Sequence, residues 1–267
     1  MCDVCGCGAG PSSVVTGGPA AGHAAPGGGG RRVSIDLGAS LLAENDRRAR
    51  HLREHFVASG VLALNIMGSP GSGKTALLEA TAHAAGSRLR LAAVSGDLAT
   101  DLDAERLDRA GIVSAPITTG TGCHLDASLV HDALHAPRLA AALRQADVFF
   151  IENVGNLVCP AVYDVGQAAN VVVLSVTEGV DKPLKYPVMF RKADLVVLTK
   201  VDLLPHLPGI SLAAITENVG RVMPAPHVIA LSAATGDGID AFVAWIDARR
   251  GGAGEPARGA VRAAPSR

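Results

Sequence analysis

The sequence predicts an α/β protein with a mostly parallel sheet and helices on both faces. Two observations carry this prediction: short apolar segments alternate with helical stretches, and a glycine-rich loop joins the first of these segments to a helix. The predicted strands occupy residues 61–67, 89–95, 113–118, 148–151, 171–176, 195–199 and 228–231. This alternation covers most of the chain, and the sequence shows no internal repeat.

Composition limits the partners that this chain can recognise. Its 267 residues are 48% apolar and 18% charged, enough to bury a good-sized core. Lys and Arg number 24 against 25 Asp and Glu, so no basic field attracts nucleic acid or an anionic membrane. No apolar run approaches the ~20 residues that span a bilayer, and the N-terminus lacks the pattern of a secretory signal. We therefore expect a cytoplasmic protein without nucleic-acid or membrane partners.

An amphipathic helix is predicted ahead of the sheet, over residues 36–59. This segment carries Leu37, Leu41, Leu52 and Phe56 among many charged residues, and Gly60 marks its C-terminal end. Gly, Ala, Pro and Ser dominate residues 8–34, so residues 1–35 are expected to form a flexible tail. A disordered C-terminal tail is expected over residues 251–267, where the same composition returns, so the α/β domain covers residues 36–250.

The strongest motif is GSPGSGKT, residues 68–75, which matches the phosphate loop of P-loop NTPases and follows the apolar segment LALNIM. Its glycines let backbone N–H groups turn toward phosphate oxygens, and the next helix favours negative charge at its N-terminus. Lys74 is predicted to contact the β- and γ-phosphates, and the Thr75 hydroxyl to bind Mg2+. The predicted phosphate-binding residues are Gly68, Gly71, Ser72, Gly73, Lys74 and Thr75. The flanking strand and helix disfavour the alternative interpretation, a plain glycine turn.

Two later loops predict that the nucleotide base is guanine, so that the ligand is GTP. The segment TKVD places Thr199, Lys200 and Asp202 at a strand end, as in the N-K-x-D motif of G proteins with Thr in place of Asn. The Asp202 carboxylate can accept hydrogen bonds from guanine N1–H and the C2 amine, whereas adenine leaves it unpaired. The segment LSAATG resembles the S-A-x loop, in which Ser232 and Ala233 place a backbone amide near the guanine oxygen.

Acidic residues after two strands are candidates for the Mg2+ and γ-phosphate contacts. The segment IENVGN places Glu152 and Gly155 at the spacing of the D-x-x-G switch motif, with Glu in place of Asp. Asp97, nearest the end of the second strand, is the candidate for a second Mg2+ contact, while Asp101 and Asp103 fit equally well as helix N-caps. The predicted catalytic residues are Lys74, Asp97 and Glu152.

Three potential metal ligands lie in loops that are expected at the nucleotide-binding edge of the sheet. Cys123 and His124 lie in GTGCHLDA, and Cys159 lies four residues after Gly155. An isolated buried cysteine is usually a small apolar residue, but two cysteines and a histidine at one edge favour a Ni2+ or Zn2+ site. Since three ligands leave such a site open, water, another side chain or a second subunit has to complete it.

Four other histidines occur in pairs spaced by one helical turn. His131 and His135 follow the internal cysteine and histidine, and they stay open as additional ligands. His51 and His55 repeat the same spacing on the first helix, which shows how common this pattern is. Both pairs are therefore interpreted as solvated side chains.

These motifs, in this order, resemble the HypB family of nickel-incorporation GTPases in hydrogenase maturation, within the SIMIBI class of P-loop GTPases. The matching segments are CxxCGCG at the N-terminus, GSPGSGKT, GTGCHLDA, IENVGNLVCP, SVTEG with DKPLKYP, and TKVDLLP, which cover residues 60–245 and the extreme N-terminus. The resemblance implies GTP hydrolysis coupled to delivery of Ni2+ to a [NiFe]-hydrogenase large-subunit precursor, together with another maturation metallochaperone. It is also consistent with a GTP-dependent homodimer, in which Lys182 or Lys185 reaches the nucleotide of the second subunit.

The cysteines at the N-terminus suit nickel better than zinc. Cys2, Cys5 and Cys7 place three thiolates in one short loop, where the terminal amine can complete a near-planar set of four donors. Structural zinc sites usually draw ligands from two separated knuckles, and no second C-x-x-C follows here. A redox-active C-x-x-C is disfavoured because no thioredoxin-like context surrounds it. Some members of the family carry a His-rich storage run after these cysteines, whereas this chain has only His23 there.

Three alternatives remain open from the sequence. A urease-type nickel-chaperone GTPase would carry Cys-Pro-His, whereas Cys123 and His124 are adjacent here. A nucleoside-type P-loop kinase would not need the guanine-reading segment from Thr199 to Asp202. A non-catalytic nickel or zinc buffer or sensor would bind GTP without turnover.

Overall fold

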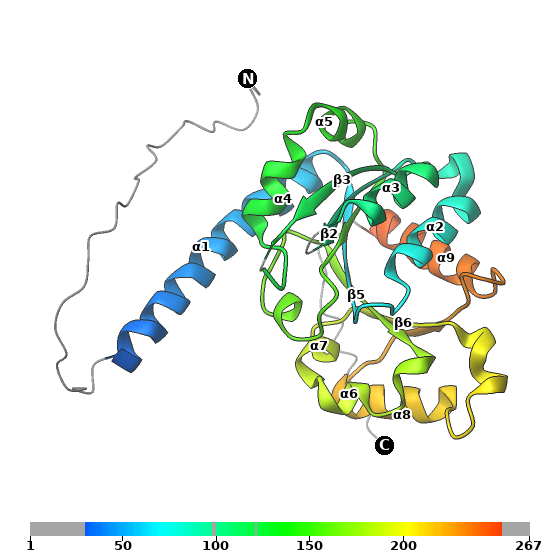
Figure 1. Cartoon of the computed structure of the whole chain (residues 1–267). Coiled ribbons are helices and arrows are strands. Elements are labelled where there is room, and N and C mark those ends of the chain that lie inside the picture. The colour runs from blue at the N-terminus through cyan, green and yellow to red at the C-terminus, as the bar shows by residue number, and fades with distance from the viewer. Residues whose placement is uncertain (1–29, 98–99, 121, 253–267) are drawn as a thin grey trace, which may run out of the picture. The chain divides into compact units, whose positions relative to one another are not determined.

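The structure is a computed structural model that describes residues 30–97, 100–120 and 122–252. The chain divides into two units, Met1–Gly38 and Ala39–Arg267. The second unit holds an α/β fold in which helices surround one sheet (Figure 1). The predicted tails fall mainly on residues 1–29 and 253–267, which lie outside the described residues.

One parallel sheet contains every strand of the described residues. The strands are β1 Leu62–Met67, β2 Leu91–Asp97, β3 Val113–Thr118, β4 Val148–Glu152, β5 Ala169–Ser175, β6 Leu195–Thr199 and β7 Val228–Ala230. Their order is β3-β2-β4-β1-β5-β6-β7, and each neighbouring pair runs parallel. The predicted α/β fold class is confirmed, and each predicted strand agrees with an observed one to within two residues.

The α-helices connect the strands and cover the sheet. They are α1 Gly30–Ala58, α2 Lys74–Ala85, α3 Leu102–Arg109, α4 Ala127–Leu134, α5 Pro137–Leu143, α6 Lys182–Lys185, α7 Pro187–Arg191, α8 Leu212–Val222 and α9 Ile239–Gly252. Short 3-10 helices lie at η1 Gly86–Arg88, η2 Cys159–Ala161, η3 Val176–Glu178 and η4 Val201–His206. None of the helices within the described ranges is long and apolar enough to cross a membrane.

Alternate residues of the strands belong to hydrophobic clusters on opposite faces of the sheet. Leu64 and Ile66 of β1 join one cluster with residues of α2 and α9. Ala63 of the same strand joins a second cluster with α1, α4 and α5, and Met67 joins a third with α7 and α8. Because side chains of a strand point alternately to opposite faces, this division places helices on both sides of the sheet.

Helix α1 is longer than predicted. It begins at Gly30 instead of residue 36, because the run of glycines at residues 27–30, which disfavour a helix interior, ends there. Leu52 and Phe56 are buried as an apolar face requires, whereas Leu41 is exposed. The predicted end at Gly60 is confirmed: this glycine has φ 68, and the Val61 N–H donates to the Phe56 carbonyl at 2.9 Å.

Phe56 anchors α1 to the sheet, and its removal provides a test of this packing. The side chain is 2% exposed and stacks on Phe149 of β4 with 5.2 Å between ring centroids. We expect Phe56→Ala to lower the free energy of unfolding by about 3–5 kcal/mol, because it leaves a cavity under α1. Val57 on the same helix is 69% exposed, so Val57→Ala serves as the control and should change stability by less than about 0.5 kcal/mol. Urea titration followed by circular dichroism measures both, and equal midpoints for the two variants would contradict the packing.

Candidate functional site

The phosphate loop leads from the end of β1 into the first turn of α2, and its backbone favours glycine at three positions. Gly68 has φ 155, Gly71 has φ 71 and Gly73 has φ 97, values that L side chains rarely adopt. A Cβ on Gly68 would also collide with the carbonyl oxygen of Val173 in β5. The loop is therefore pressed against the sheet and directs the N-terminus of α2 toward the space above it, where phosphate binds in proteins of this fold.

The side chains of Lys74 and Thr75 meet acidic groups behind the loop. The Lys74 Nζ donates to the carbonyls of Gly68 and Ser69 at 3.3 Å and 3.2 Å. The Thr75 Oγ1 lies 2.7 Å from Glu152 Oε1 and 3.1 Å from Asp103 Oδ1. A hydroxyl and two carboxylates supply the oxygen donors that Mg2+ prefers, so these residues fit the predicted ion.

Burial controls the charge state of this cluster. Glu152 is 2% exposed, and burial raises the pKa of Glu152 to about 7, although hydrogen bonds from Thr75 and Ser95 and the charge of Lys74 oppose that shift. Burial likewise lowers the pKa of Lys74, against the attraction of Glu152 and neighbouring carboxylates. Both pKa values move toward the neutral forms, so the cost of desolvation outweighs the attraction between the two groups.

A cavity of about 490 Å3 opens between the phosphate loop, α3 and the end of β4. The predicted residues that line it are Gly71, Gly73, Lys74, Thr75, Asp97, Glu152, Gly155 and Lys200. Asp97 accepts a hydrogen bond from the Thr100 hydroxyl at 2.6 Å, while Asp103, an N-cap candidate in the sequence, also lines the cavity and approaches Thr75. The structure thus adds Asp103 to the acidic residues around the predicted ion.

Thr199 and Lys200 hold the phosphate loop from the side of β6. The buried Thr199 hydroxyl donates to the Ser72 carbonyl at 2.6 Å, and the Lys200 Nζ donates to the Gly71 carbonyl at 2.8 Å. Lys200 has φ 58, the only positive value at a non-glycine residue within the described ranges. A threonine hydroxyl therefore braces the loop at the position where the G-protein motif has asparagine.

Asp202, Ser232 and Ala233 lie outside the lining of the phosphate cavity. The Asp202 Oδ1 is buried and has no hydrogen-bond partner among the described residues. Such an oxygen costs free energy unless a donor reaches it, and guanine offers two N–H groups of the required kind. The Ser232 Oγ accepts from the N–H groups of Ala234 and Thr235 at 3.2 Å each, which shapes the loop that contains Ala233.

Gly155 packs directly against the phosphate loop. A Cβ at Gly155 would lie 2.9 Å from Pro70, so only glycine permits this approach. The next residue, Asn156, forms an isolated antiparallel bridge with Gly68. The segment after β4 therefore contacts the loop that is expected to hold the phosphates.

Cys123, His124 and Cys159 meet in one cluster. Their potential ligand atoms all lie within 4.8 Å of one another, and no other group of His, Cys, Asp or Glu in the described residues meets this condition. The two Sγ atoms are 2.7 Å apart, and the Cys123 Sγ is 3.6 Å from His124 Nδ1. Since a disulfide has a sulfur separation of about 2.05 Å, both cysteines are thiols. Thiolate and imidazole donors suit Ni2+ and Zn2+.

The surroundings of the cluster influence how it can bind a metal. The His124 ring stacks on Tyr163 with 3.7 Å between centroids, and burial lowers the pKa of His124 although Asp126 opposes the shift. The hydrogen bond from Cys123, with a smaller effect of burial, raises the pKa of the Cys159 thiol. The imidazole is thus neutral and available, whereas metal binding has to displace a proton from sulfur.

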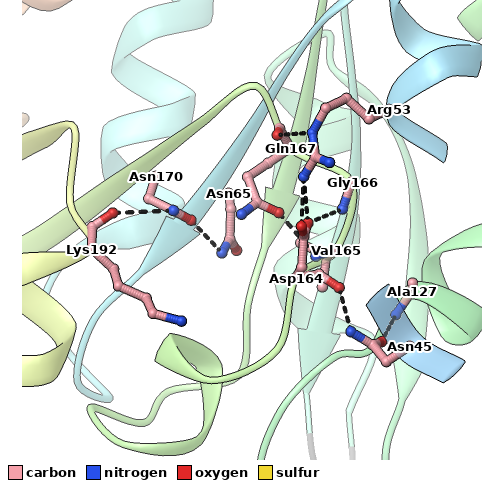
Figure 2. Close-up of polar contacts among 10 residues, drawn as sticks. All are labelled: Asn45, Arg53, Asn65, Ala127, Asp164, Val165, Gly166, Gln167, Asn170 and Lys192. Atoms are coloured by element: carbon pink, nitrogen blue, oxygen red, sulfur yellow. Dashed lines mark hydrogen bonds and ion pairs between the residues drawn. The ribbon is translucent and has the colours of Figure 1, made fainter. Parts of the chain in front are cut away.

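Helix α1 contacts the segments that follow Cys159 and His124 in sequence (Figure 2). The Asn45 amide donates to the Asp164 carbonyl at 2.9 Å and accepts from the Ala127 N–H at 2.9 Å, so one side chain joins the loop after Cys159 to the start of α4. The Arg53 guanidinium contacts both Asp164 carboxylate oxygens at 2.7 Å and the Gln167 carbonyl at 3.1 Å. These contacts support the cluster from the side of α1.

Asparagine side chains connect the end of β4 with the cysteine loop. The Asn153 Oδ1 accepts from the Leu125 N–H at 3.0 Å, and its Nδ2 donates to Asn65 Oδ1 at 3.1 Å. Asn65 in turn donates to Asn170 Oδ1 at 3.0 Å, as Figure 2 shows. Asn153 follows Glu152 and Leu125 follows His124, so this network joins the acidic cluster to the cysteine cluster.

Sequence reasoning missed several of these residues. Asn153 lies inside the IENVGN motif, so its position beside Glu152 was a usable signal. Asn45 and Tyr163 carry no such signal, because their partners are distant in sequence. Cys2, Cys5 and Cys7 lie outside the described residues, so the N-terminal nickel site stays a prediction.

The parallel sheet, the glycine-rich loop and the acidic residues behind it define a P-loop nucleotide-binding protein. Residues 62–230 match the nucleotide-binding domain of the CobW/HypB/UreG family. The hydrogenase maturation factor HypB of Rhizobium leguminosarum is 49% identical over 218 residues, covering 80% of this chain and 70% of that protein. HypB of Azotobacter vinelandii is 46% identical over 242 residues, covering 91% and 78%.

Solved structures give the same result. The crystal structure of HypB from Helicobacter pylori in complex with nickel has a TM-score of 0.75 at 36% identity, covering 81% of this chain and 99% of that one. HypB from Archaeoglobus fulgidus has a TM-score of 0.70 at 40% identity, covering 79% and 100%. The chain belongs to the HypB family of hydrogenase maturation factors.

The raised pKa of Glu152 predicts how stability depends on pH in the metal-free and nucleotide-free protein. Its usual pKa is 4.5 and its value here is about 7, so the folded state binds more protons than the unfolded state between these values. The stabilisation that comes from the raised pKa of Glu152 is complete below about pH 4.5 and is lost as pH rises through about 7. The free energy of unfolding falls over this range by at most about 3 kcal/mol.

Glu152→Gln resembles the protonated acid and provides the matched comparison. Urea unfolding of both proteins in the presence of a chelator at pH 5 and pH 8 should show that the natural protein loses more stability than the variant. Equal losses in the two proteins would contradict the assignment of a raised pKa to Glu152.

Proposed function

We propose that this protein hydrolyses GTP to GDP and phosphate and uses the nucleotide state to control a nickel site. Nickel passes from Cys123, His124 and Cys159 to the large-subunit precursor of a [NiFe]-hydrogenase. The reaction takes place in the cytoplasm, in a homodimer that GTP stabilises. Similarity to HypB proteins supports the role in hydrogenase maturation, and the cysteine cluster supports the metal.

The residues around the phosphate loop support the hydrolytic step. Lys74 stabilises negative charge on the β- and γ-phosphates as the bond to the γ-phosphate breaks. Thr75, Glu152 and either Asp97 or Asp103 would hold Mg2+, which when bound neutralises charge on the phosphate oxygens. The buried Glu152 carboxylate is suited to binding a cation, because the positive charge offsets the cost of burying the carboxylate.

The base is recognised by Asp202 and by the loop that contains Ser232 and Ala233. The partnerless Asp202 Oδ1 supports guanine, because a guanine N–H supplies the missing donor. Thr199 and Lys200 connect this region to the phosphate loop, so the residues that bind the base and those that bind the phosphates are in direct contact.

A single observation carries the coupling between nucleotide and metal: the segment from Glu152 to Cys159 contacts both sites. Gly155 packs on Pro70 of the phosphate loop, and Cys159 lies 2.7 Å from Cys123 between sulfur atoms. A γ-phosphate that binds the Gly155 N–H would move this segment, while Asn45 holds the start of α4, close to His124 in sequence, against α1. The spacing of the ligands then differs between the GTP and GDP states.

Nickel is the cargo of this internal site, and Zn2+ is its competitor for the same donors. Three protein ligands leave a position for water or for a ligand from the second subunit. The predicted N-terminal site at Cys2, Cys5 and Cys7 would capture nickel first, and another maturation metallochaperone would exchange it. Lys182 or Lys185 would reach the nucleotide of the second subunit; in one chain Lys185 pairs with Asp181 at 2.6 Å.

Asp202→Asn tests the reading of the base. We expect GTP affinity to fall roughly 10- to 100-fold, because an amide leaves a guanine donor unpaired. Affinity for xanthosine triphosphate should rise, since the amide N–H can donate to the xanthine C2 carbonyl. Competition binding measures both, and Asp240→Asn, an exposed residue of α9, is the control. Unchanged preference for GTP would rule out Asp202 as the base-reading residue.

The coupling itself predicts that nickel affinity depends on the nucleotide. In the full chain with Cys2, Cys5 and Cys7 replaced by Ser, Ni2+ titration should give different affinities with GDP and with a non-hydrolysable GTP analogue. Since binding couplings are reciprocal and typically amount to ~1–3 kcal/mol, a change of roughly 5- to 150-fold is expected.

Two variants serve as controls for that titration. Cys123→Ala with Cys159→Ala should remove the nucleotide-dependent component of nickel binding, because it removes two of the three ligands. Lys74→Ala should abolish phosphate release from GTP in the same samples. Equal nickel affinities in both nucleotide states would refute the release mechanism, and GTP binding without turnover would instead indicate a buffer or sensor.

A further inference from the structure

Four histidines that are distant in sequence lie together between α1 and α4. His51 and His55 belong to α1, and His131 and His135 to the C-terminal part of α4 and its cap. The His51 and His131 ring centroids are 6.3 Å apart, and those of His131 and His135 are 4.7 Å apart. In the sequence these histidines form two separate pairs, whereas in the structure the two pairs lie beside each other. None of the four belongs to the cysteine cluster.

The packing of the two helices fixes this arrangement. Asn45 contacts the Ala127 backbone and the Arg48 guanidinium donates to the Ser128 hydroxyl at 2.5 Å, so α4 runs parallel to α1 and in register with it. The same offset brings His51 beside His131 one turn later, and Figure 1 shows α4 beside α1. Buried residues beneath hold the helices together, namely Ala49, Leu52, Phe56, Val130 and Leu134.

The ring separations are short enough for the rings to share an ion. With an ion at the usual ~2.0 Å from each imidazole nitrogen, two ring centroids lie at most about 6.3 Å apart. The His131–His135 separation of 4.7 Å and the His51–His131 separation of 6.3 Å do not exceed this limit. Imidazole is a good ligand for Ni2+ and for Zn2+ alike.

Side-chain movements have to complete the site. The donor atoms do not all lie within 4.8 Å of one another, in contrast to those of the cysteine cluster. Each helix, however, supplies one half-buried ring, His55 or His131, and one exposed ring, His51 or His135. Exposed side chains change rotamer on the nanosecond timescale, so the two outer rings can turn toward an ion held by the inner ones.

The local electrostatics suit a cation at this position. His55 lies in the last turn of α1 and His135 caps α4, so the negative ends of both helix dipoles face the cluster. Asp132 lies 3.5 Å from His131 Nδ1 and supports a tautomer with Nε2 as the donor.

We propose that His51, His55, His131 and His135 form a second binding site for a divalent transition metal ion such as Ni2+. This site is separate from Cys123, His124 and Cys159 and does not depend on the nucleotide-coupled function proposed above. It lies at the surface that α1 and α4 share, and α4 begins at Ala127, three residues after His124.

The test uses the full chain with all five cysteines, Cys2, Cys5, Cys7, Cys123 and Cys159, replaced by Ser. This removes both thiolate sites, so a failure here is distinguishable from a failure of the nucleotide-coupled site. Isothermal titration with NiSO4 at pH 7.5 should show one Ni2+ bound per chain. His131→Gln with His135→Gln, and separately His51→Gln with His55→Gln, should each weaken Ni2+ binding at least about ten-fold, since even loss of a residue that supports a ligand has an effect of that size.

His206→Gln with His227→Gln is the matched control, because it removes two exposed histidines elsewhere and should leave Ni2+ binding unchanged. A second measurement needs no substitution of histidine: in the cysteine-free chain, paramagnetic Ni2+ should broaden the NMR signals of the four clustered rings before those of His206 and His227. Absence of Ni2+ binding in the cysteine-free chain, equal binding by the cluster and control variants, loss confined to one of the two helices, or uniform broadening of all histidines would each overturn the proposal.

Discussion

The functional residues of this protein depend on one constraint, which is that the strands of a parallel sheet all end at the same edge. The loops after β1, β4 and β6 meet there, and the phosphate loop is held between the other two. Thr199 donates to the Ser72 carbonyl from the side of β6, and Gly155 packs on Pro70 from the side of β4. A loop whose backbone N–H groups point inward has few internal contacts of its own, so these neighbours provide its support.

The charges at this edge are arranged for ligands that bring opposite charge. Lys74 and Glu152 are both buried, and burial moves each pKa toward the neutral form despite their mutual attraction. The pair is therefore poorly solvated as it stands, and an anionic phosphate beside Lys74 or a cation beside Glu152 would offset that cost. The same reasoning applies to the cysteine cluster, where the thiol of Cys159 keeps its proton until a metal ion replaces it.

Helix α1 links these regions although it precedes the sheet in sequence. The Asn45 side chain joins the segments that follow Cys159 and His124, and Arg53 holds the carboxylate of Asp164. The hydrophobic contact of Phe56 with Phe149 anchors the helix beneath these polar contacts. The helix thus acts as a rigid support for ligand-bearing loops, which need such a support because loops alone position side chains loosely.

The sequence by itself determined the fold class, the seven strands and the order of the nucleotide motifs, because apolar periodicity and glycine-rich loops are local signals. It also indicated that Cys123, His124 and Cys159 share one edge. Only the tertiary structure decided that Asp103 approaches Thr75, that Asn45 supports the cysteine cluster and that His51 meets His131. These partners are far apart along the chain, and their contacts depend on helix packing and register, which no local pattern of residues encodes.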